Sequence, residues 1–121
     1  MSAFVISKRL NGDYKFTFAS RRGKTIFTSI GCKDKADCEL IIATIKNDLE
    51  SFMLTQKRHP GGKFFFRLSR GGLVLANSRK FSTERMLQKG IDQFLDYFVT
   101  AEVLDFSDNE PVFSDAEEDS E

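Results

Sequence analysis

The sequence predicts an α+β protein in which two tandem βββα(β) repeats are merged into one antiparallel sheet with both helices on one face. Two observations lead to this prediction. Segments with alternating apolar residues precede a segment with helical apolar spacing, and this order occurs twice. The chain has 121 residues, 40% of them apolar, so the two copies together have the size of one domain.

The two copies span residues 4–50 and 52–98, and their landmark residues recur at an offset of 48 to 50. The matched pairs are Phe4 and Phe52, Gly12 and Gly62, Phe16 and Phe66, Gly23 and Gly72, Ser29 and Ser78, and Ile42 and Ile91. A period of this length in only two copies does not make a solenoid. We therefore expect one pseudo-symmetric domain over residues 1–106.

Three strands open each copy. They are predicted at residues 4–7, 14–18 and 24–29 of the first copy, and at 52–55, 64–68 and 73–78 of the second. The alternation of Phe16 and Phe18 with polar neighbours indicates a strand with one buried face. Asn11-Gly12 is typical of a tight hairpin turn, because it tolerates positive φ.

A helix follows in each copy. Asp34 or Thr83 can cap its start, because a side-chain oxygen there accepts from the free amides of the first turn. Apolar residues at helical spacing are Cys38, Ile41, Ile42, Ile45 and Leu49 in the first copy, and Leu87, Ile91, Phe94 and Phe98 in the second. A closing strand is predicted at about 102–106.

The formal net charge of zero conceals two unlike parts. Residues 1–101 carry 18 Lys plus Arg and 9 Asp plus Glu, whereas residues 102–121 carry 9 acidic residues and no basic one. Residues 107–121 contain Pro111 and have no apolar periodicity, so we expect a disordered acidic tail. Both a regulatory and a purely solubilising role remain open for this tail.

These landmarks together resemble the YegP-like family of small, mostly bacterial proteins of unknown function. The residues that carry the resemblance are Asn11-Gly12, Phe16, Gly23, Ser29, Lys35 and Ile42, and then Gly62, Phe66, Gly72, Ser78, Phe81 and Gly90-Ile91. The resemblance covers about residues 4–106. It implies two β(3)-α-β units in one sheet with exchanged terminal strands, and it implies no catalytic residues. Cys32 and Ile41 depart from the aromatic and the glycine of the pattern, which Phe81 and Gly90 keep.

The chemically reactive residues do not predict an enzyme. Cys32 and Cys38 align with Phe81 and Leu87, so both are expected to be buried as small hydrophobic residues. His59 is the only histidine, and it precedes Pro60 in a predicted turn with no nucleophile or carboxylate spaced around it. We therefore expect no catalytic residue, no metal and no cofactor.

Five residues on the sheet face opposite the helices are candidate binding residues. They are Lys15, Phe27, Lys63, Phe65 and Arg67. The preferred prediction is a protein-interaction or self-associating module, because an exposed apolar patch is typical of a partner surface. The alternative is a module that binds single-stranded nucleic acid, with bases on the rings, phosphates on the cations, and the acidic tail as a competitor. A purely structural role for this face is a third possibility.

The sequence also indicates a cytoplasmic protein without a membrane partner. Its longest apolar stretch is far shorter than the roughly 20 residues that span a bilayer. Lys8 and Arg9 follow, rather than precede, the first apolar segment, which is not the order of a secretory signal. Two cysteines do not form a disulfide framework of the kind found in small secreted proteins.

Overall fold

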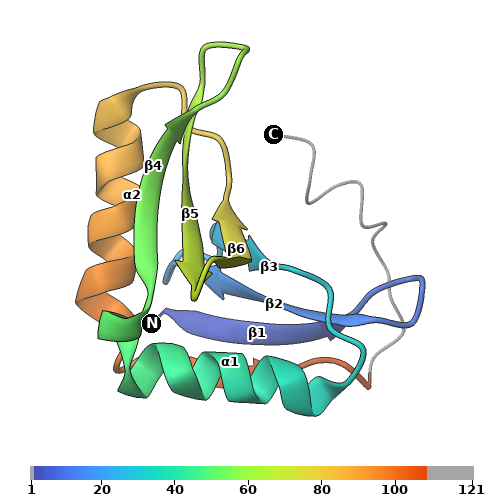
Figure 1. The fold of residues 1–121 in the computed structure, drawn as a ribbon. Coiled ribbons are helices and arrows are strands. Elements are labelled where there is room, and N and C mark those ends of the chain that lie inside the picture. The colour runs from blue at the N-terminus through green and yellow to red at the C-terminus, as the bar shows by residue number, and fades with distance from the viewer. Residues whose placement is uncertain (1, 109–121) are drawn as a thin grey trace.

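The computed structural model describes residues 2–108, which form a seven-stranded sheet and two helices (Figure 1). In chain order the elements are β1 (Ala3–Lys8), β2 (Tyr14–Ala19), β3 (Thr25–Ser29), α1 (Lys35–Asn47), a 3-10 turn (Leu49–Ser51), β4 (Met53–Arg58), β5 (Phe64–Arg70), β6 (Leu73–Ser78), α2 (Glu84–Tyr97) and β7 (Glu102–Asp105). The order of strands across the sheet is β4-β5-β6-β3-β2-β1-β7. The predicted α+β class and the order of elements are confirmed.

The predicted fully antiparallel sheet is wrong at one edge. β7 runs parallel to β1, with Ala3 opposite Glu102 and Ile6 opposite Asp105, whereas the other neighbouring strands run antiparallel. β7 thus pairs with the first strand of the chain and not with a strand of its own half. This is the exchange of a terminal strand that the family resemblance implies.

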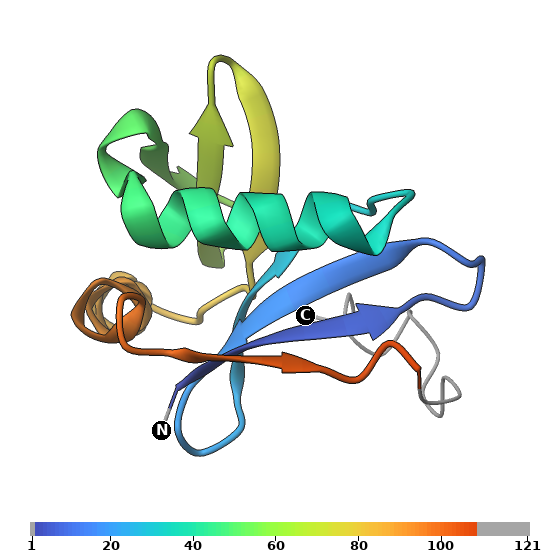
Figure 2. The ribbon, with the colours of Figure 1, turned by 90° about the horizontal axis from the view of Figure 1, so that it is seen from below.

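Both helices cover the same face of the sheet (Figures 1 and 2). The ring of Phe94 in α2 lies 5.3 Å from that of Phe18 and 5.1 Å from that of Phe27, between ring centroids. α1 adds Cys38, Ile42 and Ile45 to the same core cluster. The large side chains at the centre of this cluster, all fully buried, are Phe4, Phe16, Phe18, Phe27, Phe66 and Phe94. The predicted single helical layer is therefore present.

The two halves use the same local hydrogen bonds. The amide of Phe16 donates to the Ser29 hydroxyl at 2.9 Å, and the amide of Phe66 donates to the Ser78 hydroxyl at 2.8 Å. In the opening strands, Lys8 lies opposite Tyr14 and Arg58 lies opposite Phe64. The position equivalent to Phe4 is therefore Leu54, and the predicted match of Phe4 with Phe52 is wrong by two residues.

The two helix starts differ. Thr83 caps α2, since its hydroxyl accepts from the amide of Met86 at 3.1 Å. Asp34 stands at the equivalent position of α1, but its side chain makes no capping hydrogen bond. The predicted cap is thus confirmed for Thr83 only. Leu49 lies in the 3-10 turn after α1, not in the helix as predicted.

The two departures from the family pattern align with two residues that are in contact in the second half. The buried ring of Phe81 lies against Gly90, where an added Cβ would be 2.7 Å from its Cζ atom. The equivalent pair in the first half is Cys32 and Ile41, a small residue in place of the ring and a large one in place of the glycine. The first half therefore has a smaller residue after the strand and a larger residue in the helix than the second half has.

Gly90→Ala is expected to lower the free energy of unfolding by about 1–3 kcal/mol, because the methyl group forces the Phe81 ring to move. Helix propensity alone would favour alanine by about 1 kcal/mol, so a loss reports the clash. Urea denaturation measures the change. Gly90→Ala should cost less unfolding free energy in a Phe81→Leu protein than in the wild type, because the clashing ring is gone. A Gly90→Ala protein that is more stable than the wild type would contradict the packing argument.

Candidate functional site

The face of the sheet opposite the helices carries a row of side chains that crosses every strand. Each residue of the row is the cross-strand partner of the next. From β7 to β4 the row is Leu104, Val5, Thr17, Thr28, Asn77, Arg67 and Thr55. The row is mostly polar. It carries one cation, Arg67, whose Nε donates to Asn77 Oδ1 at 2.9 Å.

Phe65 and Arg67 are the two predicted site residues that the structure brings together. The Arg67 guanidinium lies over the Phe65 ring, 5.7 Å from its centroid. Lys57 of β4 is the strand partner of Phe65. One aromatic ring thus lies beside two cations near the β4 edge of this face.

The other two predicted cations lie elsewhere. Lys15 is on the same face, but on β2, which two strands separate from β5, and the residue is only 5% exposed. Lys63 lies in the turn just before β5 and is exposed. The predicted residues therefore do not form one continuous patch.

The predicted position of Phe27 is wrong. Its side chain is fully buried on the helix-covered face, with its ring centroid 5.6 Å from that of Phe18 and 6.1 Å from that of Phe66. The cause is the register, because Phe18 pairs directly with Phe27 and a β-bulge follows between Phe18 and Ala19. Directly paired residues share a face, so the row of rings on the opposite face loses one of its two predicted members.

The two thiols are buried, as predicted from their alignment with apolar residues. Burial raises the pKa of Cys38 to about 12, and the neighbouring Cys32 adds to the effect. Burial also raises the pKa of Cys32. A thiol is a nucleophile only as its thiolate, so both are poor candidates for covalent chemistry.

His59 has a structural role in a turn. The Nδ1 atom of His59 accepts from the amide of Gly61 at 3.1 Å, which holds the β4–β5 turn. Within residues 2–108, no group of three or more His, Cys, Asp or Glu side chains could hold a metal ion. Neither helix in this part of the chain is long and apolar enough to cross a membrane.

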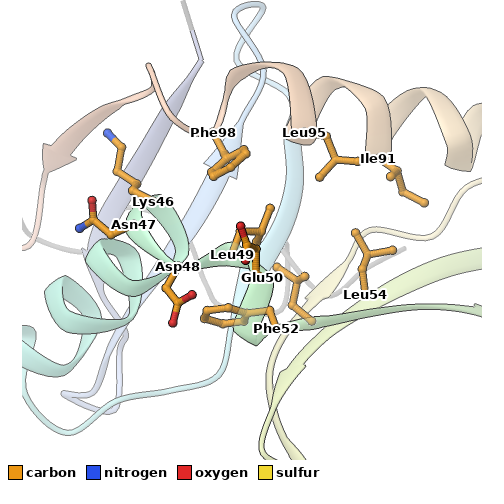
Figure 3. A pocket seen from close by; sticks show the side chains of 11 residues that line it. Lys46, Asn47, Asp48, Leu49, Glu50, Phe52, Leu54, Ile91, Leu95 and Phe98 are labelled. Carbon is orange, nitrogen blue, oxygen red and sulfur yellow. The ribbon is translucent and has the colours of Figure 1, made fainter.

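A cavity of about 580 Å³ opens on the helix-covered side, beside β4 (Figure 3). Ile91 and Leu95 of α2 face Leu54 of β4 across it. The rest of the lining is Lys46, Asn47, Asp48, Leu49, Glu50, Phe52, Leu68 and Phe98. The walls between α2 and β4 are apolar, and the charged residues belong to the end of α1 and the turn that follows it.

The equivalent place in the first half, between α1 and β7, holds a smaller cavity of about 380 Å³, lined by Glu39, Ile42, Ala43, Lys46, Asn47, Val99 and Val103. There Phe4 stands where Leu54 stands in the second half, and Phe4 is fully buried whereas Leu54 is half-buried. Val103 of β7 lies opposite Phe4 in the sheet, and the Ala101 carbonyl accepts from Lys46 Nζ at 2.5 Å. The segment that leads into β7 therefore narrows this position, whereas no segment among residues 2–108 takes the equivalent place beside β4.

The outer edge of β4 presents unpaired backbone groups. The amides of Tyr14 and Phe64 both donate away from the opening strand of their hairpin, to the Cys32 and Phe81 carbonyls. Their partners Lys8 and Arg58 therefore direct their own backbone groups outward, as do alternate residues before them. On β1 these outward groups receive β7, since the Ile6 carbonyl accepts from the Phe106 amide at 2.8 Å. On β4 they belong to Leu54, Gln56 and Arg58, and no strand among residues 2–108 pairs with them.

This edge and its cavity were not predicted from the sequence. The predicted strand at 52–55 ends three residues early, because Gln56, Lys57 and Arg58 have no apolar alternation. Leu95 gave a weak signal: it is an apolar residue at a helix position outside the predicted stripe, and it is 45% exposed.

The end of β7 is fixed by a carboxylate. Ser107 donates to Asp105 Oδ1 through its hydroxyl at 2.5 Å and its amide at 2.9 Å, and Lys35 Nζ lies 3.0 Å from Oδ2. These partners lower the pKa of Asp105 to about 2. Ser107 is thus packed onto the domain, one residue beyond the predicted boundary at 106; the predicted tail from residue 109 on lies outside the described residues.

Asp105→Asn is expected to weaken the dependence of stability on acidic pH. Because the folded protein lowers this pKa, the carboxylate stabilises the fold above the ordinary Asp pKa of about 4, and this contribution is lost as the pH falls through about 2. Urea denaturation at a series of pH values between about 5 and 2 measures it. Ser107→Ala should reduce the dependence in the same direction, and a wild-type profile in both variants would contradict the assignment.

Comparison with known proteins points to one family. No family model matches the chain. The "UPF0339 protein in ptx operon 5′ region" of Stutzerimonas stutzeri is 26% identical over 104 residues, which are 84% of this chain and 94% of that protein. The UPF0339 protein YegP of Shigella flexneri is 28% identical over 90 residues, which are 73% of this chain and 82% of that protein.

Two solution structures share the fold. YegP from Escherichia coli, described as a protein of unknown function, superposes with a TM-score of 0.79 at 23% identity, covering 90% of this chain and 96% of that one. The UPF0339 protein SO3888 from Shewanella oneidensis gives 0.78 at 18% identity, covering 90% and 94%. These similarities in sequence and fold confirm the predicted resemblance to the YegP-like proteins of the UPF0339 family.

Proposed function

We propose that this chain is a protein-interaction module that binds an extended segment of polypeptide along the outer edge of β4. The observation that carries the proposal is the contrast between the two sheet edges. β1 is covered by β7 and its Phe4 is fully buried, whereas the described residues leave β4 uncovered and an apolar cavity open beside Leu54. An uncovered strand edge is a template for pairing with another chain.

Strand addition supplies the affinity in this mode of binding. The outward amides and carbonyls of Leu54, Gln56 and Arg58 would pair with the bound segment, as those of β1 pair with β7. Main-chain hydrogen bonds of this kind are independent of sequence. Selectivity must therefore come from the side chains that the segment directs into neighbouring pockets.

The cavity supplies that selectivity. Its volume of about 580 Å³ is large enough for apolar side chains, and Leu54, Ile91 and Leu95 form its apolar walls. Exposed Lys57 and Arg58 follow at the carboxyl end of β4. The arrangement favours a segment with apolar residues beside Leu54 and a carboxylate at the end that lies near Lys57 and Arg58.

The proposal also covers the origin of the two halves, the absence of catalysis and the cellular setting. We infer that the two halves are tandem repeats, supported by their shared element order and hydrogen bonds. We infer a non-enzymatic role, supported by the raised pKa values of both thiols. Free Cys32 and Cys38 fit a reducing, cytoplasmic setting.

A synthetic peptide with the sequence of residues 99–106 tests the proposal, because it contains the segment that covers β1. It should bind the full chain and shift the NMR amide signals of β4 and α2. Leu95→Glu should weaken binding at least tenfold, because a carboxylate then faces the apolar cavity. The matched control Leu40→Glu changes an exposed leucine of α1 that does not line the cavity, and should bind as the wild type does. Shifts confined to other surfaces, or equal affinities of all three proteins, would refute the proposal.

Single-stranded nucleic acid is the second candidate, and the Phe65 ring between Lys57 and Arg67 favours it. The burial of Phe27 weakens it, because stacking platforms use several rings. Titration of single-stranded DNA or RNA at low and high salt tests it, on the full chain and on a chain that ends at Asp108. The absence of binding to both proteins at low salt would exclude it.

A further inference from the structure

We propose that the segment bound at the β4 edge is the acidic C-terminal segment of a second copy of this chain, centred on residues 110–115. This inference rests on the proposed function and names its partner. It makes the module self-associating, with the edge of one copy receiving the segment of another.

The strand that covers β1 defines the chemistry that such an edge accepts. β7 reads Glu102-Val103-Leu104-Asp105, two apolar residues between two acids, with Val103 opposite Phe4. The acid of β7 with a cationic partner is Asp105, which pairs with Lys35 of α1, and on the β4 side the neighbouring cations are Lys57 and Arg58 at the end of the strand. A segment for β4 should therefore also have apolar residues between acids.

The C-terminal segment has this pattern. Phe106-Ser107-Asp108-Asn109-Glu110 recurs seven residues later as Phe113-Ser114-Asp115-Ala116-Glu117. Glu110 and Asp115 enclose the apolar pair Val112-Phe113. Residues 110–115 therefore have the same order as β7, with apolar residues between two acids.

The charges around the β4 edge place this segment with its apolar pair at the cavity. Exposed Arg70 lies near the start of β4, its guanidinium 6.0 Å from the centroid of the Phe52 ring, and exposed Lys57 and Arg58 lie at the other end. These cations face the two acidic ends of a bound segment. The cavity is lined by two carboxylates, Asp48 and Glu50, and by Lys46, which donates to the Ala101 carbonyl, and its other walls are mostly apolar, so Val112 and Phe113 are the residues that would enter it.

The segment cannot reach the β4 edge of its own copy. Asp105 is paired with Lys35 at the start of α1, and Asp108 is close enough to raise the pKa of the same lysine. α1 has 13 residues, a length of about 20 Å, and β4 begins only beyond its other end (Figure 1). Val112 is four residues after Asp108, a reach of about 14 Å at most. The pairing must therefore join two copies.

Complementation between two full-length variants tests the inference. Sedimentation velocity should show association of the wild type that increases with concentration and decreases with salt. Leu95→Glu, which alters the cavity, and Val112→Ser/Phe113→Ser, which alters the segment, should each be monomeric alone. Mixed together they should form a one-to-one pair, because each variant retains the part that the other has lost.

The outcomes separate this inference from the proposed function. A monomeric wild type, or a Val112→Ser/Phe113→Ser variant that associates like the wild type, would overturn the inference. If the peptide of residues 99–106 still binds at β4 in that case, the edge binds a segment of another protein and the proposed function stands. If that peptide does not bind either, both proposals are wrong.

Discussion

Phe27→Ala is expected to lower the free energy of unfolding by about 3–5 kcal/mol, the largest loss of stability among the changes considered. The Phe27 ring is fully buried and contacts rings from both halves of the chain. Its centroid lies 6.5 Å from that of Phe4 and 6.3 Å from that of Phe16 in the first half, and 5.1 Å from that of Phe94 in the second. Its removal leaves a cavity where the two halves meet.

Phe65→Ala is the matched control, since it removes the same ring from the opposite face of the sheet. Phe65 is half-buried, so its loss should cost much less than the loss of Phe27. Urea denaturation followed by circular dichroism measures both variants. A Phe27→Ala protein that unfolds at the same urea concentration as Phe65→Ala would contradict the position of Phe27 at the centre of the core.

The contrast between these two phenylalanines shows how far local sequence patterns determine this fold. Alternation of apolar and polar residues predicted the buried face correctly for Phe16 and Phe18 in β2. In β5, the alternation of Phe66 and Leu68 with their neighbours did the same. It failed at Phe27, because Ile26 and Phe27 are adjacent apolar residues and both are buried. Phe27 faces the helices because it pairs with Phe18 of β2, next to a β-bulge. The sequence of β3 alone does not determine this pairing.

The candidate site was unpredictable for a related reason. The sequence indicates seven strands and their order along the chain, but an uncovered edge is a property of their order in the sheet. That order depends on β7 joining β1 across about 100 residues of chain. Local residue patterns do not determine such long-range pairings, and it is the resulting order of strands that leaves β4 at an edge, beside the apolar cavity.

Two neighbouring proline substitutions in β4 should have opposite consequences. Thr55 directs its backbone toward β5, where it pairs with Arg67, so Thr55→Pro removes a hydrogen bond of the ladder. We expect a loss of more than about 2 kcal/mol of unfolding free energy. Gln56 directs its backbone outward, so Gln56→Pro removes a donor that the β4–β5 pair does not use.

Gln56→Pro should therefore unfold close to the wild type and yet lose binding of the peptide of residues 99–106. Its ring replaces the outward amide with a carbon atom, and a strand that approaches β4 loses a hydrogen bond and meets a steric obstacle. Gln56→Ala separates the backbone from the side chain, because it should bind as the wild type does. Urea denaturation and peptide titration of the three variants test the argument. Equal binding by Gln56→Pro and Gln56→Ala would show that the bound peptide makes no backbone contact with β4, and strand addition would be the wrong mechanism.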